Sequence, residues 1–136
     1  MKKYKFLKHT ADIKFKAYGN TLEKAFENSA IAMFKTMYPG NVKPNMKKKI
    51  KTKGKDFESL LYGFLEKLII MLDSKDFFIS KCKVKINKDK FELVALLYGD
   101  KVKNYPTNLE VKAITYNEMF VKKIKNEWVC QVVLDV

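Results

Sequence analysis

Two acidic residues lie near opposite ends of the chain and could act together as metal ligands. Asp12 follows the single histidine, His9, and Asp135 precedes the last residue, Val136. If the fold joins the ends, the two side chains and the terminal carboxylate would converge, and three crowded carboxylates need a cation to neutralise their repulsion. Spacing alone leaves a second interpretation open, in which both aspartates are ordinary surface acids.

The remaining reactive residue types do not form a recognisable catalytic motif. Cys82 and Cys130 fall in strand-like segments without a Cys-x-x-Cys or Cys/His spacing, so we expect two reduced thiols and no zinc site. A metal-dependent hydrolase could use Asp12 and Asp135 as ligands. The chain has no evident nucleophile with a base and no G-x-x-x-x-G-K-[ST] phosphate loop, so we expect no catalytic residues.

Length and composition predict a single domain spanning residues 1–136. At 136 residues, with 47% hydrophobic and 13% aromatic residues, the chain can bury a sizeable core. No apolar run reaches the roughly 18 residues that span a bilayer, and the charged start does not have the apolar region of a signal peptide. We therefore expect a cytoplasmic protein without a membrane partner.

The positive charge favours an anionic partner but not specific recognition of nucleic acid. The formal charge is +13, and all 28 basic residues are lysines. Specific phosphate and guanine recognition draws on the planar fork of arginine, which is missing from the sequence. The charge still favours weak, salt-sensitive contact with nucleic acid. The run Lys47–Lys49 would contribute to it, unless that run is only a solvated strand end.

The clearest internal pattern is a repeat with an offset of 35 residues, covering 15–37 and 50–72. Each copy has the pattern of a strand, a glycine turn, an N-cap (Thr21 or Asp56) and a helix with an acid in its first turn. Apolar residues at spacings of three and four predict that one face of each helix is buried. The two stripes are Leu22, Ala25, Phe26, Ser29, Ala30, Met33, Phe34 and Met37, and Phe57, Leu60, Leu61, Phe64, Leu65, Leu68, Ile69 and Leu72.

The C-terminal half is predicted to be β-structure. Lysines alternate with apolar side chains from Lys81 to Ile86, which predicts one solvated face, whereas Leu93–Leu97 is apolar throughout, as is typical of a central strand. The order of elements predicts an α+β fold, with two amphipathic helices packed on a largely antiparallel sheet. β-branched and aromatic residues mark five strands, at 77–86, 91–98, 109–116, 120–124 and 128–134.

Several of these segments resemble motifs of the archease family, in order and over nearly the whole chain. Each segment alone would carry little weight, but their order at full chain length makes the resemblance specific. The matching segments are His9–Ile13, Gly19–Phe26, Asp56–Leu61 followed by Asp73, Glu110–Tyr116, Trp128 and Leu134–Val136.

This resemblance implies a small accessory protein with no reaction of its own. Archeases assist the RtcB-type RNA ligase, a GTP- and manganese-dependent enzyme that joins exon halves in tRNA splicing. They promote guanylylation of the ligase's active-site histidine, so that the ligase turns over repeatedly, and they can broaden its use of nucleoside triphosphates. The family fold resembles two strand-helix-strand-strand modules, one inserted in the other. The alternative function is a basic RNA-binding module acting in tRNA processing, with weak contact to tRNA.

The resemblance also implies a set of site residues. The family's metal site, which holds calcium in archaeal members, maps onto Asp12, Asp135 and the terminal Val136. Such hard oxygen donors suit calcium, manganese or magnesium. Lys112 matches a lysine considered functional in the family. His9 matches the first motif position, where it would contact the metal or the partner, or would be a buried, hydrogen-bonded histidine.

The chain departs from the family pattern at three places. Asn117 stands where the family usually has a histidine after the Thr-Tyr pair. The loop at Tyr105–Asn108 does not contain the histidines that many members carry there. Lys14 replaces a common glycine and lies close to the expected acidic site.

Overall fold

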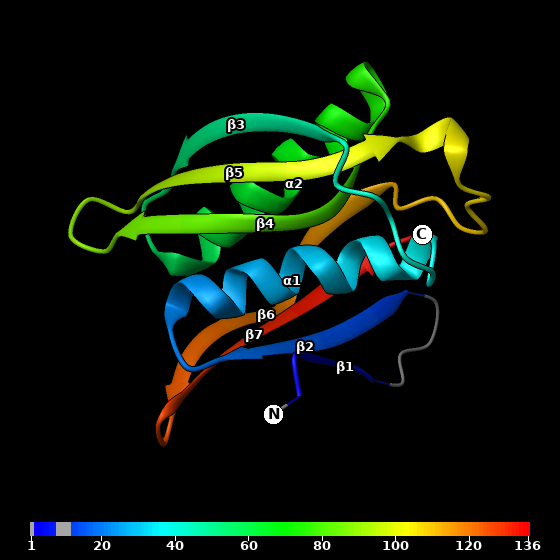
Figure 1. Ribbon diagram of the computed structural model, residues 1–136. Helices are drawn as coiled ribbons and strands as arrows, with labels where there is room; N and C mark the ends of the chain where they lie inside the picture. The colour runs from blue at the N-terminus through cyan, green and yellow to red at the C-terminus, as the bar shows by residue number, and fades with distance from the viewer. Residues whose placement is uncertain (1, 8–11) are drawn as a thin grey trace.

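The strands of the protein form two antiparallel sheets in the computed structural model, which describes residues 2–7 and 12–136 (Figure 1). Sheet A has four strands in the order β1 (Tyr4–Leu7), β2 (Ile13–Gly19), β7 (Glu127–Asp135) and β6 (Ala113–Ile124). Sheet B has three strands in the order β3 (Met46–Lys53), β5 (Glu92–Lys101) and β4 (Phe77–Asn87). The helices are α1 (Leu22–Met37), α2 (Phe57–Lys75) and the short 3-10 helix η1 (Val102–Asn104).

The order of these elements confirms the prediction of an α+β fold with two interleaved modules. β3, α2, β4 and β5 form an inserted module that separates β2 and α1 from β6 and β7. In each module the last strand lies between the first and the second: β5 lies between β3 and β4, and β7 lies between β2 and β6. β1 is an additional strand at the edge of sheet A.

Both long helices begin at the N-caps predicted from the repeat. The Thr21 hydroxyl accepts a hydrogen bond from the N–H of Lys24 at 3.1 Å. The Asp56 carboxylate accepts one from the N–H of Ser59 at 2.7 Å, and the Ser59 hydroxyl accepts the N–H of Asp56 in return, which completes a capping box. In the described part of the chain, no helix is both long and apolar enough to cross a membrane.

The glycine before each N-cap allows strand and helix to approach closely. A Cβ atom on Gly19 would lie 2.4 Å from the backbone nitrogen of Ala25, and one on Gly54 would lie 2.6 Å from that of Leu60. Any other residue would push the helix away from the strand that precedes it. The repeat in the sequence therefore reflects the same close packing of strand against helix in both modules.

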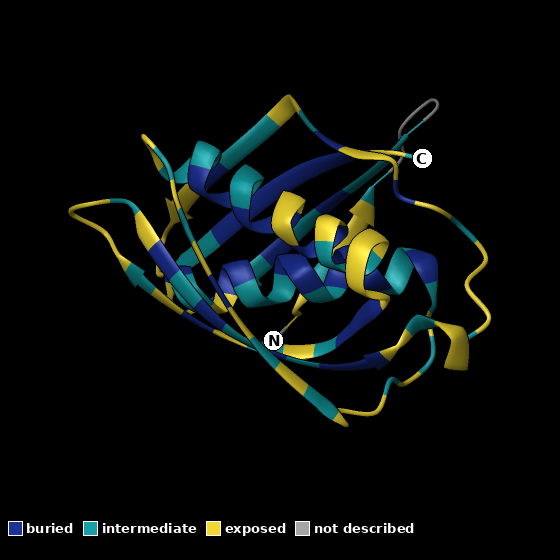
Figure 2. Ribbon diagram, turned by 90° about the horizontal axis from the view of Figure 1, so that it is seen from above, coloured by how far each residue is buried: buried dark blue, intermediate teal, exposed yellow. Residues whose placement is uncertain are grey.

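The apolar stripes of both helices face one hydrophobic core (Figure 2). Each fully buried large side chain contributes roughly 1.5–3 kcal/mol relative to an exposed one. The central position predicted for the apolar strand is confirmed, because β5 lies in the middle of sheet B. The largest buried side chains are Phe15, Phe26, Phe64, Phe77, Phe78, Leu22, Met33, Leu60, Leu61, Leu65, Leu68 and Leu93.

Each long helix also packs against the second strand of the other module. α1 contacts β4 and α2 contacts β6, and both strands lie at the edges of their sheets. The Glu27 carboxylate on α1 accepts the outward N–H of Val84 on β4 at 2.9 Å. The Glu58 carboxylate on α2 accepts that of Val121 on β6 at 3.0 Å. Each helix thus supplies an acceptor that a further strand would otherwise have to provide.

β6 differs from the sequence pattern, which predicts two strands at 109–116 and 120–124. The structure has one strand that begins at Ala113, with a register shift between Thr115 and Phe120. The Gln131 side chain of β7 donates to the carbonyl of Glu118 at 2.8 Å and supports this irregular segment. The polar residues of this segment have the sequence pattern of a turn. The side chain that supports the segment belongs to β7 and is not visible in the local sequence.

Replacing Glu58 with alanine should lower the free energy of unfolding by about 1–3 kcal/mol, because the buried side of the β6 edge loses its acceptor. Glu58→Gln keeps an acceptor oxygen and should cost less. Glu66→Ala, at an exposed position of the same helix, is the matched control and should change stability by no more than about 0.5 kcal/mol. Urea unfolding followed by circular dichroism measures all three. Equal losses for the two alanine variants would contradict this role of Glu58.

Candidate metal and partner-contact site

The pairing of β2 with β7 brings the two terminal acids to the same end of sheet A. Ile13 pairs with Leu134, and Asp12 and Asp135 are the next residues beyond that pair. Because the strands are antiparallel, both residues lie on the same side of the pair. Val136 follows directly, so the terminal carboxylate lies at this end as well. Residues more than 120 positions apart are thus neighbours in the fold.

Both carboxylates are available to a cation. Asp12 is half-buried and Asp135 is exposed. Within residues 2–7 and 12–136, neither side chain forms an ion pair or accepts a hydrogen bond. Lys14, two residues from Asp12, pairs instead with Glu118 at 2.9 Å. Lys14 therefore does not neutralise the acidic end.

A metal site at this end would depend on the chain terminus. The described residues hold no group of three or more His, Cys, Asp or Glu side chains placed to bind a metal. The terminal carboxylate of Val136 would have to act as the third protein donor beside Asp12 and Asp135. Such an all-oxygen set suits calcium, magnesium or manganese better than zinc or copper. His9 lies outside the described residues.

Lys112 adjoins the acidic end through its backbone. Its N–H donates to the carbonyl oxygen of Asp135 at 2.8 Å, and the next residue, Ala113, pairs with Asp135 in the ladder between β6 and β7. The Lys112 side chain is exposed. The backbone therefore fixes Asp135 from one side while the ammonium group faces solvent, where a partner can reach it.

The Thr-Tyr pair of the same strand presents an aromatic surface. Tyr116 is 55% exposed, and its ring stacks on that of Tyr62 from α2, with centroids 4.3 Å apart and planes 8° from parallel. Burial of the hydroxyl raises the pKa of Tyr116, with a smaller contribution from Tyr62. Asn117 is exposed in the irregular segment of β6.

A tyrosine holds the loop that follows β5. The Tyr105 hydroxyl donates to the Asp100 carboxylate at 2.7 Å and accepts the N–H of Lys43 at 2.9 Å. Asp100 also accepts the N–H of Lys101 at 2.9 Å. These bonds, that of Tyr105 first, lower the pKa of Asp100. Sequence reasoning missed this network, because Tyr105 joins a strand end to a distant connecting segment.

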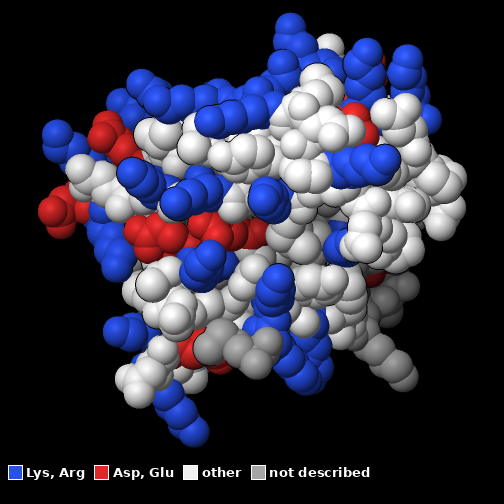
Figure 3. Space-filling view, viewed as in Figure 1, with Lys and Arg blue, Asp and Glu red and all other residues white. Residues whose placement is uncertain are grey.

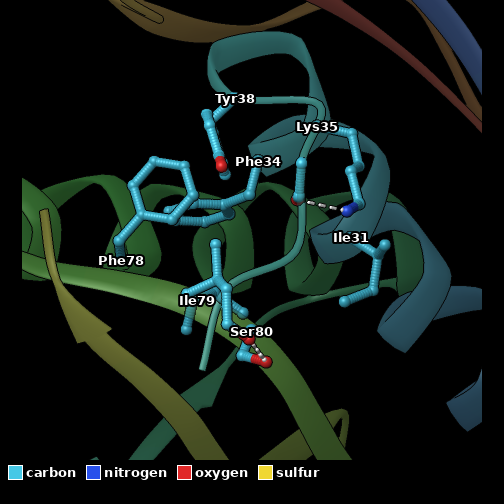
Figure 4. Close-up of a pocket in the computed structure, with 9 residues that line it drawn as sticks. Ile31, Phe34, Lys35, Tyr38, Phe78, Ile79 and Ser80 are labelled. Atoms are coloured by element: carbon cyan, nitrogen blue, oxygen red, sulfur yellow. Dashed lines mark hydrogen bonds between the residues drawn. The ribbon is translucent and has the colours of Figure 1, made fainter. Parts of the chain in front are cut away.

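The cavity between α1 and β4 is too small to hold an organic substrate (Figure 4). Its volume of about 20 Å³ is close to that of a single water site. Aromatic rings of Phe34, Tyr38 and Phe78 line it, and Lys35 donates to the carbonyl of Gly40 at 2.7 Å at its rim. The cavity is therefore a packing feature of the core.

The two cysteines are free, as predicted. Burial raises the pKa of the Cys82 thiol and of the Cys130 thiol to about 12 in each case. Both thiols are therefore protonated at neutral pH, and a thiol nucleophile is not expected.

Known proteins share both the sequence pattern and the fold. The model of the Archease protein family matches residues 4–136. Proteins called archease from Pyrococcus abyssi and Pyrococcus furiosus are 38% and 40% identical, and each alignment covers 100% of both chains. The solution structure of protein 1598 from Methanobacterium thermoautotrophicum is 34% identical, covers 100% of both chains and has a TM-score of 0.86. A Thermotoga maritima archease, described as a possible chaperone, shares the fold at 19% identity, with a TM-score of 0.68 and coverage of 96% and 94%.

The bond between Tyr105 and Asp100 predicts a specific dependence of stability on pH. Because folding lowers the pKa of Asp100, its contribution is present above the unfolded pKa of about 3.9 and is lost as pH falls through the folded value. The difference in free energy of unfolding between wild type and Tyr105→Phe should therefore narrow as pH falls from about 5 to about 2. Tyr4→Phe is the control, with a difference from wild type that stays constant over this range. A constant difference for Tyr105→Phe would contradict the prediction.

Proposed function

The chain belongs to the archease family, and from this premise we propose that it is a non-catalytic activator of an RtcB-type RNA ligase. It would promote guanylylation of the ligase's active-site histidine, sustain multiple turnover in tRNA splicing and broaden the ligase's use of nucleoside triphosphates. The ligase and its reaction are carried over from the family resemblance. The features of this chain that support an accessory role are the exposed residues around the acidic end of sheet A.

The register of β2 and β7 is the observation that carries the proposal. It makes Asp12 and Asp135 neighbours beyond the pair of Ile13 and Leu134, and it brings Val136 to the same place. These three residues would hold a divalent ion, calcium first, with manganese or magnesium as alternatives. When bound, the ion would supply positive charge that neutralises the three carboxylates and joins the ends of the chain.

The surroundings of the acidic end favour contact with another protein. Lys112 and Tyr116 are exposed within a few residues of Asp135's strand partner, Ala113. A lysine, a large aromatic ring and a cluster of carboxylates offer charge and apolar area together, as partner-binding surfaces commonly do. The description of the Thermotoga maritima relative as a possible chaperone agrees with a protein partner.

Removing the carboxylates should abolish stimulation of the ligase without unfolding the protein. Asp12→Asn and Asp135→Asn each delete one charged ligand, and a short C-terminal extension moves the terminal carboxylate away from Val136. We expect weakened calcium binding by calorimetry and loss of multiple-turnover ligation. Asp89→Asn, at an exposed hairpin position, is the matched control. Near-wild-type stimulation by both aspartate variants would refute the metal-site account, and unchanged turnover with the extended protein would refute a role for the terminus.

Lys112→Ala should separate partner contact from metal binding. Its backbone bond to Asp135 survives the substitution, so calcium affinity should stay within about twofold while ligase stimulation falls by tenfold or more, equivalent to about 1.4 kcal/mol. Lys103→Ala, at another exposed lysine, serves as the control and should stimulate normally. Parallel loss of calcium binding and stimulation in Lys112→Ala would show that the side chain acts through the metal site instead.

A further inference from the structure

The outer face of sheet B carries two rows of lysines separated by an apolar strip, which we call the lysine face. Figure 3 shows two lines of basic side chains over β3 and β4, with uncharged atoms between them. The central strand β5 contributes the half-buried residues Val94, Leu96 and Tyr98. The exposed lysines are Lys47, Lys49, Lys51 and Lys53 on β3, and Lys81, Lys83 and Lys85 on β4.

Strand register sets this arrangement. Two-residue steps along each strand space the lysines about 6.7 Å apart in a row, and two strand separations put the rows about 9.6 Å apart. Lys47 and Lys81 approach the ring of Tyr98 from both sides, with their Nζ atoms 5.9 and 5.3 Å from its centroid. Each apolar residue has a lysine opposite on either side: Tyr98 has Lys47 and Lys81, Leu96 has Lys49 and Lys83, and Val94 has Lys51 and Lys85.

The charge of the lysine face is only partly balanced within the protein, because Glu23 and Glu27 of α1 line the same surface groove as Lys81 and Lys83. Among the described residues, none of the seven lysines forms an ion pair. The one acid of the face, Glu92, lies at its end opposite Lys53. Like charges at this density repel one another, so a bound polyanion would relieve a repulsion that the isolated protein retains.

Protection of sheet edges does not account for both rows. Lysines on an exposed edge strand discourage pairing with other chains, and this explains lysines on β3. The edge of β4 is already covered by α1, where Glu27 accepts the N–H of Val84. Edge protection therefore does not explain the row formed by Lys81, Lys83 and Lys85, of which Lys81 and Lys83 lie beside Glu23 and Glu27 of α1.

We propose that the lysine face binds the sugar-phosphate backbone of single-stranded nucleic acid. Phosphates recur along an extended strand at an interval comparable to that of the lysines, whereas acids on a folded protein surface have no fixed interval. The apolar strip offers Tyr98 and its neighbours to sugars and bases, in the manner of single-strand binding surfaces. The strip is half-buried and flanked by lysines on both sides, which does not suit insertion into a lipid surface. Lysine acts as a point charge, so binding should be independent of sequence.

Binding to a fluorescent 20-nucleotide oligouridylate, measured by anisotropy over a range of salt concentrations and without any ligase, tests this proposal. The logarithm of affinity should fall with the logarithm of salt concentration, with a slope approaching about −5 if seven contacts form. Lys49→Gln, Lys51→Gln and Lys83→Gln combined should make the slope shallower by about 2 and weaken binding roughly 100-fold at 0.1 M salt. Arginine at the same three positions should restore both.

The matched control replaces Lys67, Lys103 and Lys123 with glutamine, which removes the same charge from exposed positions outside the lysine face. Thermal melting confirms that each variant is folded. Equal weakening in the control and the lysine-face variant would overturn the proposal, because net charge alone would then explain binding. Binding to polyglutamate or to phosphatidylserine vesicles without binding to oligouridylate would also overturn it, in favour of an acidic protein or a membrane. Ligase stimulation is not part of the test, so its outcome is separate from that of the proposed activator role.

Discussion

The fold depends on each helix completing the sheet of the other module. α1 covers the edge of β4 and α2 covers the edge of β6, with Glu27 and Glu58 accepting the outward N–H groups. Because the inserted module lies between α1 and β6 in the sequence, sheet A is complete only when β2 pairs with β7 from the far end of the chain. The same long-range closure that completes sheet A also brings Asp12 beside Asp135. The pairing that completes sheet A and the acidic end therefore depend on the same strand register.

The helices and their boundaries could be predicted from sequence because the information is local. Caps at Thr21 and Asp56 and the apolar stripes lie within a few residues of the turns that they define. The division of the strands into two sheets and the irregular part of β6 could not be predicted in this way. They depend on contacts such as that of Gln131 with Glu118, between strands whose pairing is not encoded in either segment alone.

The acidic end shows the same limit. From spacing alone, Asp12 and Asp135 could have been ordinary surface acids, and only the family resemblance predicted that they share one site. The register between strands from opposite ends of the chain has no local sequence signature. The lysines of β4 were visible in the sequence as alternation, and part of those of β3 as the run Lys47–Lys49. Their convergence around β5 required the pairing of three strands. The network of Asp100 and Tyr105 had no pattern at all, since it joins a strand end to a connecting segment.

The covered edges of β4 and β6 also determine how copies of this protein meet. With those two edges closed, β1 and β3 are the remaining edge strands of the two sheets. β1 is only 4 residues long, and β3 carries five lysines in its 8 residues. Edge-to-edge approach through β3 would juxtapose two such rows, so crowding in a concentrated solution is opposed by charge, and added salt weakens that barrier.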